Sequence, residues 1–256
     1  MILFKGLLKL CNALVSLALF IMLLAAGAYS VYALWDNNQI YTAADDVQSA
    51  MQGLKPVVSD DEQNAGPSFA DLLAINEDVC GWLTLDGTKI DYPVVQGENN
   101  LTYINKDVYG NFALAGSIYL DTRNNRDFSD RYSLLYGHHM SESRMFGDLD
   151  LYKDPKFFEE NSTGTLITPE GVYNLKIFAC VLAPAGESSI FDPTTSQTNI
   201  NKLMSYVQSN AMYVRQDLMD QLTREDAPRI LSCTTCSSEY TDARTILLAI
   251  MIPVSQ

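Results

Sequence analysis

Two cysteines and one arginine near the C-terminus have the clearest capacity for chemistry. Cys233 and Cys236 lie three positions apart in the stretch RILSCTTC, and Arg244 follows eight positions after the second cysteine. A C-x-x-C pair can be a redox couple, half of a zinc site, or a nucleophile beside an inert thiol. The function of the protein depends on which of these three applies.

The residues around the two cysteines predict a β-strand, because the stretch is rich in β-branched residues and lacks a helical continuation. Neighbouring side chains of a strand point to opposite faces, so Thr234 and Cys236 share one face and Cys233 faces the other. A redox pair normally lies at the N-terminus of a helix, and a zinc site needs a second pair of ligands that this sequence lacks. The pattern favours Cys236 as a nucleophile and Cys233 as a core residue. It predicts no metal site, and it leaves a thiol–disulfide enzyme that uses both cysteines as an alternative.

A cysteine nucleophile needs a base or a nearby cation, and the sequence contains two histidines, His138 and His139. Adjacent residues in an extended chain face opposite sides, so these two rings are not expected to share one site or one metal ion. We expect one of them to pair with Cys236.

Arg244 is placed at the start of the strand that follows the cysteines. If residues 237–242 form the connecting loop, Cys236 and Arg244 lie at the same rim of the sheet. The donor fork of the guanidinium could then bind a substrate carbonyl or a developing oxyanion. The simpler alternative is an ion pair between Arg244 and Glu239 or Asp242.

The N-terminal segment predicts a membrane anchor. Residues 10–35 carry no charge, and this run is long enough for a helix that spans a membrane. Lysines precede the run and acidic residues follow it, which places the N-terminus in the cytoplasm. A cleaved signal peptide is the alternative. The expected order is a cytoplasmic N-terminus (1–9), a transmembrane anchor (10–35), an extracellular stalk (36–67) and a catalytic domain (68–256). Within the stalk, some helix is expected around residues 43–54.

Net charge argues against one class of partner, and cysteine content argues against one class of fold. The formal net charge of −14 argues against a nucleic-acid partner, since phosphate binding needs clustered Lys and Arg. The five cysteines are too few and too irregularly spaced for a dense disulfide scaffold, although a single Cys80–Cys180 bond stays possible.

The sequence pattern after the predicted membrane anchor predicts a mostly β domain. Short runs of β-forming residues alternate with turn residues, including two strands joined at Asp86–Gly87. A Ser-x-x-Asp start at Ser68 predicts a short helix, and residues 198–211 have apolar residues at helical spacing. Many short strands with few helices predict a closed or nearly closed β-barrel with added short helices.

Taken together, YGH (136–138), the strand that ends in Thr-Thr-Cys (234–236) and Arg244 in YTDAR resemble the sortases, the membrane-anchored cysteine transpeptidases of Gram-positive bacteria. Residues 76–110, 115–125 and 134–152 resemble class B members in particular. The resemblance implies an eight-stranded β-barrel with added helices. The family signature Thr-Leu-x-Thr-Cys reads Ser-Cys-Thr-Thr-Cys here, so Cys233 stands at the leucine position.

The resemblance also implies roles for individual residues. Cys236 would be the nucleophile, His138 the general acid/base and Arg244 the substrate-binding and oxyanion-stabilising cation, with no cofactor and no metal. Substrate contacts would come from Ile104, Ile190 and Thr234, although core packing is an equal explanation for the two isoleucines.

The implied reaction cleaves a C-terminal sorting signal of a secreted protein after a threonine, through a thioester on Cys236. The acyl group then passes to an amine of a peptidoglycan precursor or a pilin subunit. Two further alternatives are an exported cysteine protease that mainly hydrolyses and a non-catalytic binding module.

Overall fold

The computed structural model describes residues 2–57, 66–224, 227–236 and 242–254, except for the side chains of residues 2, 3, 223 and 236. These residues divide into two compact units, 1–43 and 44–256. The helices are α1 (Ile2–Gln52), α2 (Phe69–Ile75), α3 (Pro155–Glu160), α4 (Ser188–Phe191), α5 (Pro193–Thr198), α6 (Ile200–Asn210) and α7 (Gln216–Met219), with the 3-10 helices η2 (Gly147–Lys153) and η3 (Asp220–Thr223). The strands are β1 (Val79–Leu85), β2 (Asp91–Val95), β3 (Ile118–Leu120), β4 (Tyr132–Tyr136), β5 (His139–Met140), β6 (Arg144–Met145), β7 (Thr163–Thr168), β8 (Gly171–Pro184), β9 (Ala211–Val214), β10 (Arg229–Cys236) and β11 (Ala243–Pro253).

Helix α1 is a single helix of 51 residues. It is long and apolar enough to cross a membrane. At 1.5 Å per residue it measures about 75 Å, more than twice the roughly 30 Å of a bilayer core, so only part of it can lie within a bilayer.

The last turns of α1 belong to the second unit, which begins at Ala44. Met51 is buried in a cluster with Trp82 of β1, and Gln48 accepts a hydrogen bond from the Tyr92 hydroxyl at 2.9 Å. Residues 44–52, which the sequence placed in the stalk, therefore pack against the barrel. Helix α2 begins as predicted, with Ser68 and Asp71 forming a capping box.

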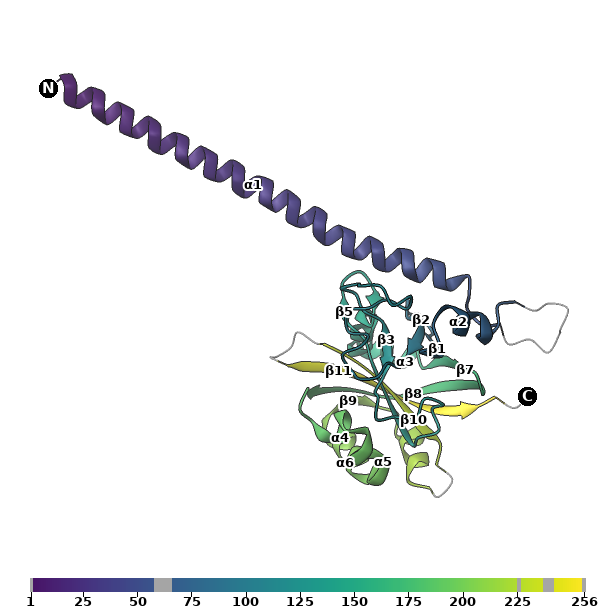
Figure 1. Ribbon diagram of the computed structural model, residues 1–256. Coiled ribbons are helices and arrows are strands. Elements are labelled where there is room, and N and C mark those ends of the chain that lie inside the picture. The colour runs from purple at the N-terminus through teal and green to yellow at the C-terminus, as the bar shows by residue number, and fades with distance from the viewer. Residues whose placement is uncertain (1, 58–65, 225–226, 237–241, 255–256) are drawn as a thin grey trace. The chain divides into compact units, whose positions relative to one another are not determined.

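Eight strands close into a barrel (Figure 1), as the sequence predicted. Around the ring they follow the order β1, β2, β3, β4, β10, β11, β8 and β7, and β7 returns to β1. Strand β9 pairs with β8 outside this ring. The pairs β2–β3 and β4–β10 are parallel and the others antiparallel. The parallel pair β4–β10 matters for the site, because both strands end at the same rim.

Each of the eight strands contributes to one buried cluster that fills the barrel. A second cluster lies between the outer face of β4, β8, β10 and β11 and the helices α4, α6 and α7, and Figure 1 shows α4, α5 and α6 grouped together beside the sheet. Helix α6 buries Leu203, Met204 and Val207 there, at the spacing that predicted a helix. A third cluster covers the outer face of β1 with α2 and the end of α1.

The Asp86–Gly87 turn joins β1 to β2 as predicted. Gly87 has φ of 76°, and a Cβ there would lie 1.9 Å from Oδ1 of Asn161. Glycine is favoured at this turn, because the backbone is left-handed and any other side chain would have to displace that of Asn161.

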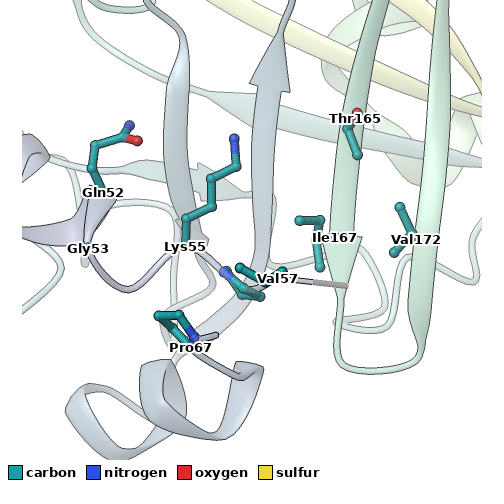
Figure 2. Close-up of a pocket in the computed structure, with 9 residues that line it drawn as sticks. Gln52, Gly53, Lys55, Val57, Pro67, Thr165, Ile167 and Val172 are labelled. Carbon is teal, nitrogen blue, oxygen red and sulfur yellow. The ribbon is translucent and has the colours of Figure 1, made fainter. Parts of the chain in front are cut away.

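A pocket of about 560 Å³ lies where the segment after α1 passes the β7–β8 hairpin (Figure 2). Its lining residues are Gln52, Gly53, Lys55, Pro56, Val57, Pro67, Thr165, Ile167 and Val172. Lys55 is the only titratable side chain among them, and its ammonium is held 2.9 Å from a carboxylate oxygen of Asp91. The lining contains no cysteine or histidine and its lysine is ion-paired, so this pocket is not a candidate site for the chemistry of a cysteine nucleophile.

Candidate active site

Three chain segments that carry the predicted catalytic residues meet at one rim of the barrel. The antiparallel register pairs Cys236, the last residue of β10, with Arg244 near the start of β11. The parallel register pairs Thr234 with Tyr136, the last residue of β4, and Gly137 donates a backbone hydrogen bond to the Thr234 carbonyl at 3.2 Å. His138 therefore follows β4 at the rim where β10 ends and β11 begins.

A pocket of about 420 Å³ opens at this rim. Its lining residues are Ile104, Tyr119, Tyr136, Gly137, His138, Ala185, Phe191, Thr234, Thr235 and Arg244. The side chain of Cys236 lies outside the described part of the structure, but its backbone places it directly after two residues that line this pocket.

His138 is fixed by a hydrogen bond to the loop that precedes β3. Its Nε2 lies 2.7 Å from the backbone carbonyl oxygen of Ile104. A carbonyl oxygen can only accept, so Nε2 carries the proton in this contact. The neutral ring then has Nδ1 as its basic nitrogen, and the protonated ring can donate a proton from Nδ1.

His139 serves a different environment, as the strand geometry predicted. Its Nε2 lies 3.0 Å from a carboxylate oxygen of Asp150. The same carboxylate accepts from Thr245 Oγ1 at 2.8 Å and pairs with Lys153. Burial would raise the pKa of Asp150, but the hydrogen bonds from His139, Lys153 and Thr245 outweigh it and lower the pKa to about 2.

Arg244 has its guanidinium available for an oxygen ligand. Within the described ranges it forms no ion pair with Asp242 or any other carboxylate, and its Nη1 donates to the carbonyl of its neighbour Ala243 at 3.0 Å. Glu239, the other partner considered from the sequence, lies outside the described residues. A half-buried guanidinium that lines the pocket can bind an anionic oxygen through two donors.

Cys233 points into the barrel and not into the pocket. It is 3% exposed and belongs to the cluster that fills the barrel. Its thiol is free, and burial raises its pKa well above the usual value. Such a thiol stays protonated and is a poor redox partner, which argues against the thiol–disulfide alternative. Cys80 is also a buried free thiol, so it forms no bond with Cys180.

The three predicted substrate contacts are placed differently. Ile104 and Thr234 line the pocket. Ile190 is fully buried between α4 and the sheet, and its carbonyl accepts from the Tyr132 hydroxyl at 2.9 Å. Ile190 thus fits core packing, and its neighbour Phe191 lines the pocket in its place.

Tyr119, Tyr136 and Thr235 also line the pocket and were not named as substrate contacts from the sequence. Tyr119 and Tyr136 stack with their ring centroids 5.3 Å apart, and the buried hydroxyls of Thr234 and Thr235 have no hydrogen-bond partner among the residues that the structure describes. Tyr119 comes from β3, whose pairing with β4 is long-range and has no local signal in the sequence. The pocket therefore combines aromatic walls with hydroxyl groups and one cation. Within the described residues, no group of His, Cys, Asp and Glu side chains is arranged to hold a metal ion.

Comparison with known proteins agrees on one family. A scan against known protein-family profiles finds no match. The chain is 27% identical over 210 residues to Sortase B of Staphylococcus aureus, covering 81% of this chain and 84% of that protein. It is 28% identical over 206 residues to Sortase B of Listeria monocytogenes, covering 80% and 81%.

A solved structure supports the same relationship. The crystal structure of Spy0129, a Streptococcus pyogenes class B sortase involved in pilus biogenesis, matches with a TM-score of 0.65 and 38% identity. The match covers 72% of this chain and 97% of that one.

Proposed function

The chain belongs to the class B sortases, a family of cysteine transpeptidases, and on that premise we propose that Cys236, His138 and Arg244 are its catalytic residues. The observation that carries this proposal is the strand register. It brings the end of β10, the start of β11 and the end of β4 to one rim around a single pocket.

In the proposed first step, the Cys236 thiolate attacks the carbonyl carbon of a threonine in a C-terminal sorting signal. The carbonyl π bond opens and its oxygen becomes negative. Arg244 stabilises this charge through its guanidinium donors. The negative charge exists only in the transition state and the intermediate, so this contact accelerates the step more than it strengthens substrate binding.

In the second step the carbon–nitrogen bond breaks and a thioester remains on Cys236. The leaving amine takes a proton from His138, which donates from Nδ1 because Nε2 is held by the Ile104 carbonyl. The amine leaves as a neutral group. His138 becomes the neutral base that the next step requires.

In the third step an acceptor amine attacks the thioester. His138 removes its extra proton, a new amide bond forms and the Cys236 thiolate is released. The acceptor is proposed to be an amine of a peptidoglycan precursor or a pilin lysine. The second choice draws support from Spy0129, which is described as involved in pilus biogenesis.

The proposal includes the location of the enzyme. Helix α1 anchors it in the cell membrane as a single span with the N-terminus in the cytoplasm, and the catalytic domain faces outward. Support comes from the apolar run and from the lysines that precede it.

A transfer assay tests the function. Purified enzyme is mixed with a panel of sorting-signal peptides, each with and without an amine acceptor, and the products are identified by mass. The proposal predicts a new amide product that depends on the acceptor. If every peptide is only hydrolysed with every acceptor, the enzyme is a protease and transpeptidation is refuted. If no peptide is cleaved, the catalytic proposal fails.

A further inference from the structure

A buried carboxylate behind the pocket connects three of its walls. Asp121 follows β3, and its side chain is fully buried. It accepts hydrogen bonds from Arg123 (backbone N and Nε to Oδ1, Nη2 to Oδ2), from Asn100 and from the Tyr136 hydroxyl. Burial alone would raise its pKa, but the hydrogen bonds and charge of Arg123 outweigh it and hold the pKa below its usual value.

The first wall is the aromatic one. The Tyr136 hydroxyl lies 3.1 Å from Oδ2 of Asp121. Burial and the neighbouring carboxylate raise the pKa of Tyr136, so the hydroxyl stays a donor. This contact fixes the ring that stacks on Tyr119, and both rings line the pocket.

The second wall is the loop that ends at Ile104. The amide of Asn100 donates to Asp121 at 2.9 Å and accepts from the backbone of Thr122 at 2.8 Å. Both ends of this amide are therefore fixed. Ile104 follows four residues later, and its carbonyl is the group that holds His138.

The third wall is the α4–α5 junction. Arg123 Nη2 donates to the carbonyl of Phe191 at 2.8 Å, and its Nη1 lies 3.5 Å from the carboxylate of Asp192. Phe191 ends α4 and lines the pocket, and Asp192 caps α5. One guanidinium thus joins Asp121 to this segment.

We propose that Asp121 and Arg123 form a clamp that sets the spacing of the three walls and thereby determines which sorting signals the enzyme accepts. The inference rests on the proposed function for its substrate. Both residues are positioning residues, because they act through Tyr136, Phe191 and the loop ending at Ile104.

Asp121→Asn opens the clamp in either orientation of the new amide. In the wild type, both carboxylate oxygens of Asp121 accept hydrogen bonds. Arg123 donates to Oδ1, and Arg123, Asn100 and Tyr136 donate to Oδ2. An amide nitrogen at the first position faces Arg123. At the second it faces Arg123 and the amide nitrogen of Asn100, which cannot accept, and the Tyr136 hydroxyl, which would have to turn from donor to acceptor. Arg123→Lys is the milder variant, since it keeps the charge and loses the fork.

The control variant is Asp91→Asn. Asp91 is a half-buried carboxylate that accepts from Lys55, Trp82 and Thr84, none of which lines the pocket. It reports what the loss of a comparable carboxylate does to stability alone.

The test measures KM and kcat for a sorting peptide, together with hydrogen exchange of residues 99–104 and 188–192. Asp121→Asn is expected to raise KM about 10-fold or more and also to lower kcat, because it frees the loop whose Ile104 carbonyl holds His138, and Arg123→Lys is expected to raise KM by a smaller factor. Both should speed exchange in the two segments, whereas Asp91→Asn should change neither KM nor exchange there.

The clamp is refuted if Asp121→Asn and Arg123→Lys keep the wild-type KM and exchange, or if Asp91→Asn raises KM as much. If Asp121→Asn fails to fold, Arg123→Lys carries the test. A wild-type enzyme that forms no thioester overturns the proposed function, and exchange alone then decides whether the clamp holds the two segments.

Discussion

Substitution of Gly116 by alanine should impair catalysis by displacing the carbonyl that holds His138. Gly116 has φ of 61°, and a Cβ there would lie 2.5 Å from the Ile104 oxygen. Cβ atoms essentially never approach closer than 3.0 Å, so this oxygen must move by about 0.5 Å or more. The hydrogen bond to His138, now 2.7 Å long, then lengthens or breaks.

A displacement of this size is large for a proposed catalytic group. Misplacement by about 1 Å can lower a rate about 100-fold, so we expect kcat of Gly116→Ala to fall about 10- to 100-fold. The left-handed backbone conformation is strained for alanine and should lower the free energy of unfolding by about 1–2 kcal/mol. The assay is steady-state acyl transfer with a sorting peptide, alongside urea unfolding.

Gly110→Ala is the matched control, because it lies in the same loop with φ of 83° and a Cβ there meets no atom within 4 Å. It carries the same backbone strain without the clash. We expect a similar loss of stability and a kcat within about twofold of wild type. If the two variants lose kcat equally, or if Gly116→Ala keeps it, the Ile104 carbonyl does not orient the histidine.

Three further predictions concern single side chains. Arg244→Ala should lower kcat/KM about 100- to 1000-fold and Arg244→Lys by less, because the ammonium keeps the charge and loses the fork; a wild-type value for Arg244→Ala would remove it from the oxyanion site. Cys233→Ala should keep activity and cost about 1–2 kcal/mol of unfolding free energy, whereas Cys236→Ala abolishes activity; equal losses would restore the thiol–disulfide alternative. The pKa of Asp150 is lowered from 3.8 to about 2, so its stabilising contribution is complete above pH 4 and is lost as the pH falls toward 2. After allowance for its partial exposure, the wild type should lose about 1 kcal/mol more than Asp150→Asn between pH 4 and 2 in urea unfolding; parallel curves would contradict this.

The position of the proposed site was predictable because it follows from strand geometry. Alternation placed Cys233 and Cys236 on opposite faces, and the short loop before Arg244 placed it beside Cys236. The structure has Cys233 in the barrel core and pairs Cys236 with Arg244. Alternation also separated His138 from His139, which contact the Ile104 carbonyl and Asp150 respectively.

The walls of the pocket were harder to predict because they depend on long-range contacts. Ile190 and Phe191 are neighbours in a helix of four residues, and periodicity over one turn does not tell which of them faces the sheet. The Asp121–Arg123 clamp joins segments about 20 and 70 residues apart, and polar side chains of this kind look like ordinary surface residues in a sequence.

The N-terminal boundary shows the same limit. Residues 44–52 are polar enough to look like a stalk, yet Gln48 and Met51 contact the barrel. Local composition does not reveal that a helix with one apolar residue per turn has a partner surface elsewhere in the chain.

The most direct test of the account is a single-turnover experiment that locates the acyl group. The enzyme is mixed with an intact sorting peptide that it cleaves, in the absence of acceptor, then quenched in acid, digested and sequenced by mass spectrometry, with Cys236→Ala as the control. We expect a thioester of the threonine-terminated fragment on Cys236 that disappears when an amine is added. An adduct on Cys233 or any other residue, or release of product with no adduct on Cys236 at any time, would contradict it.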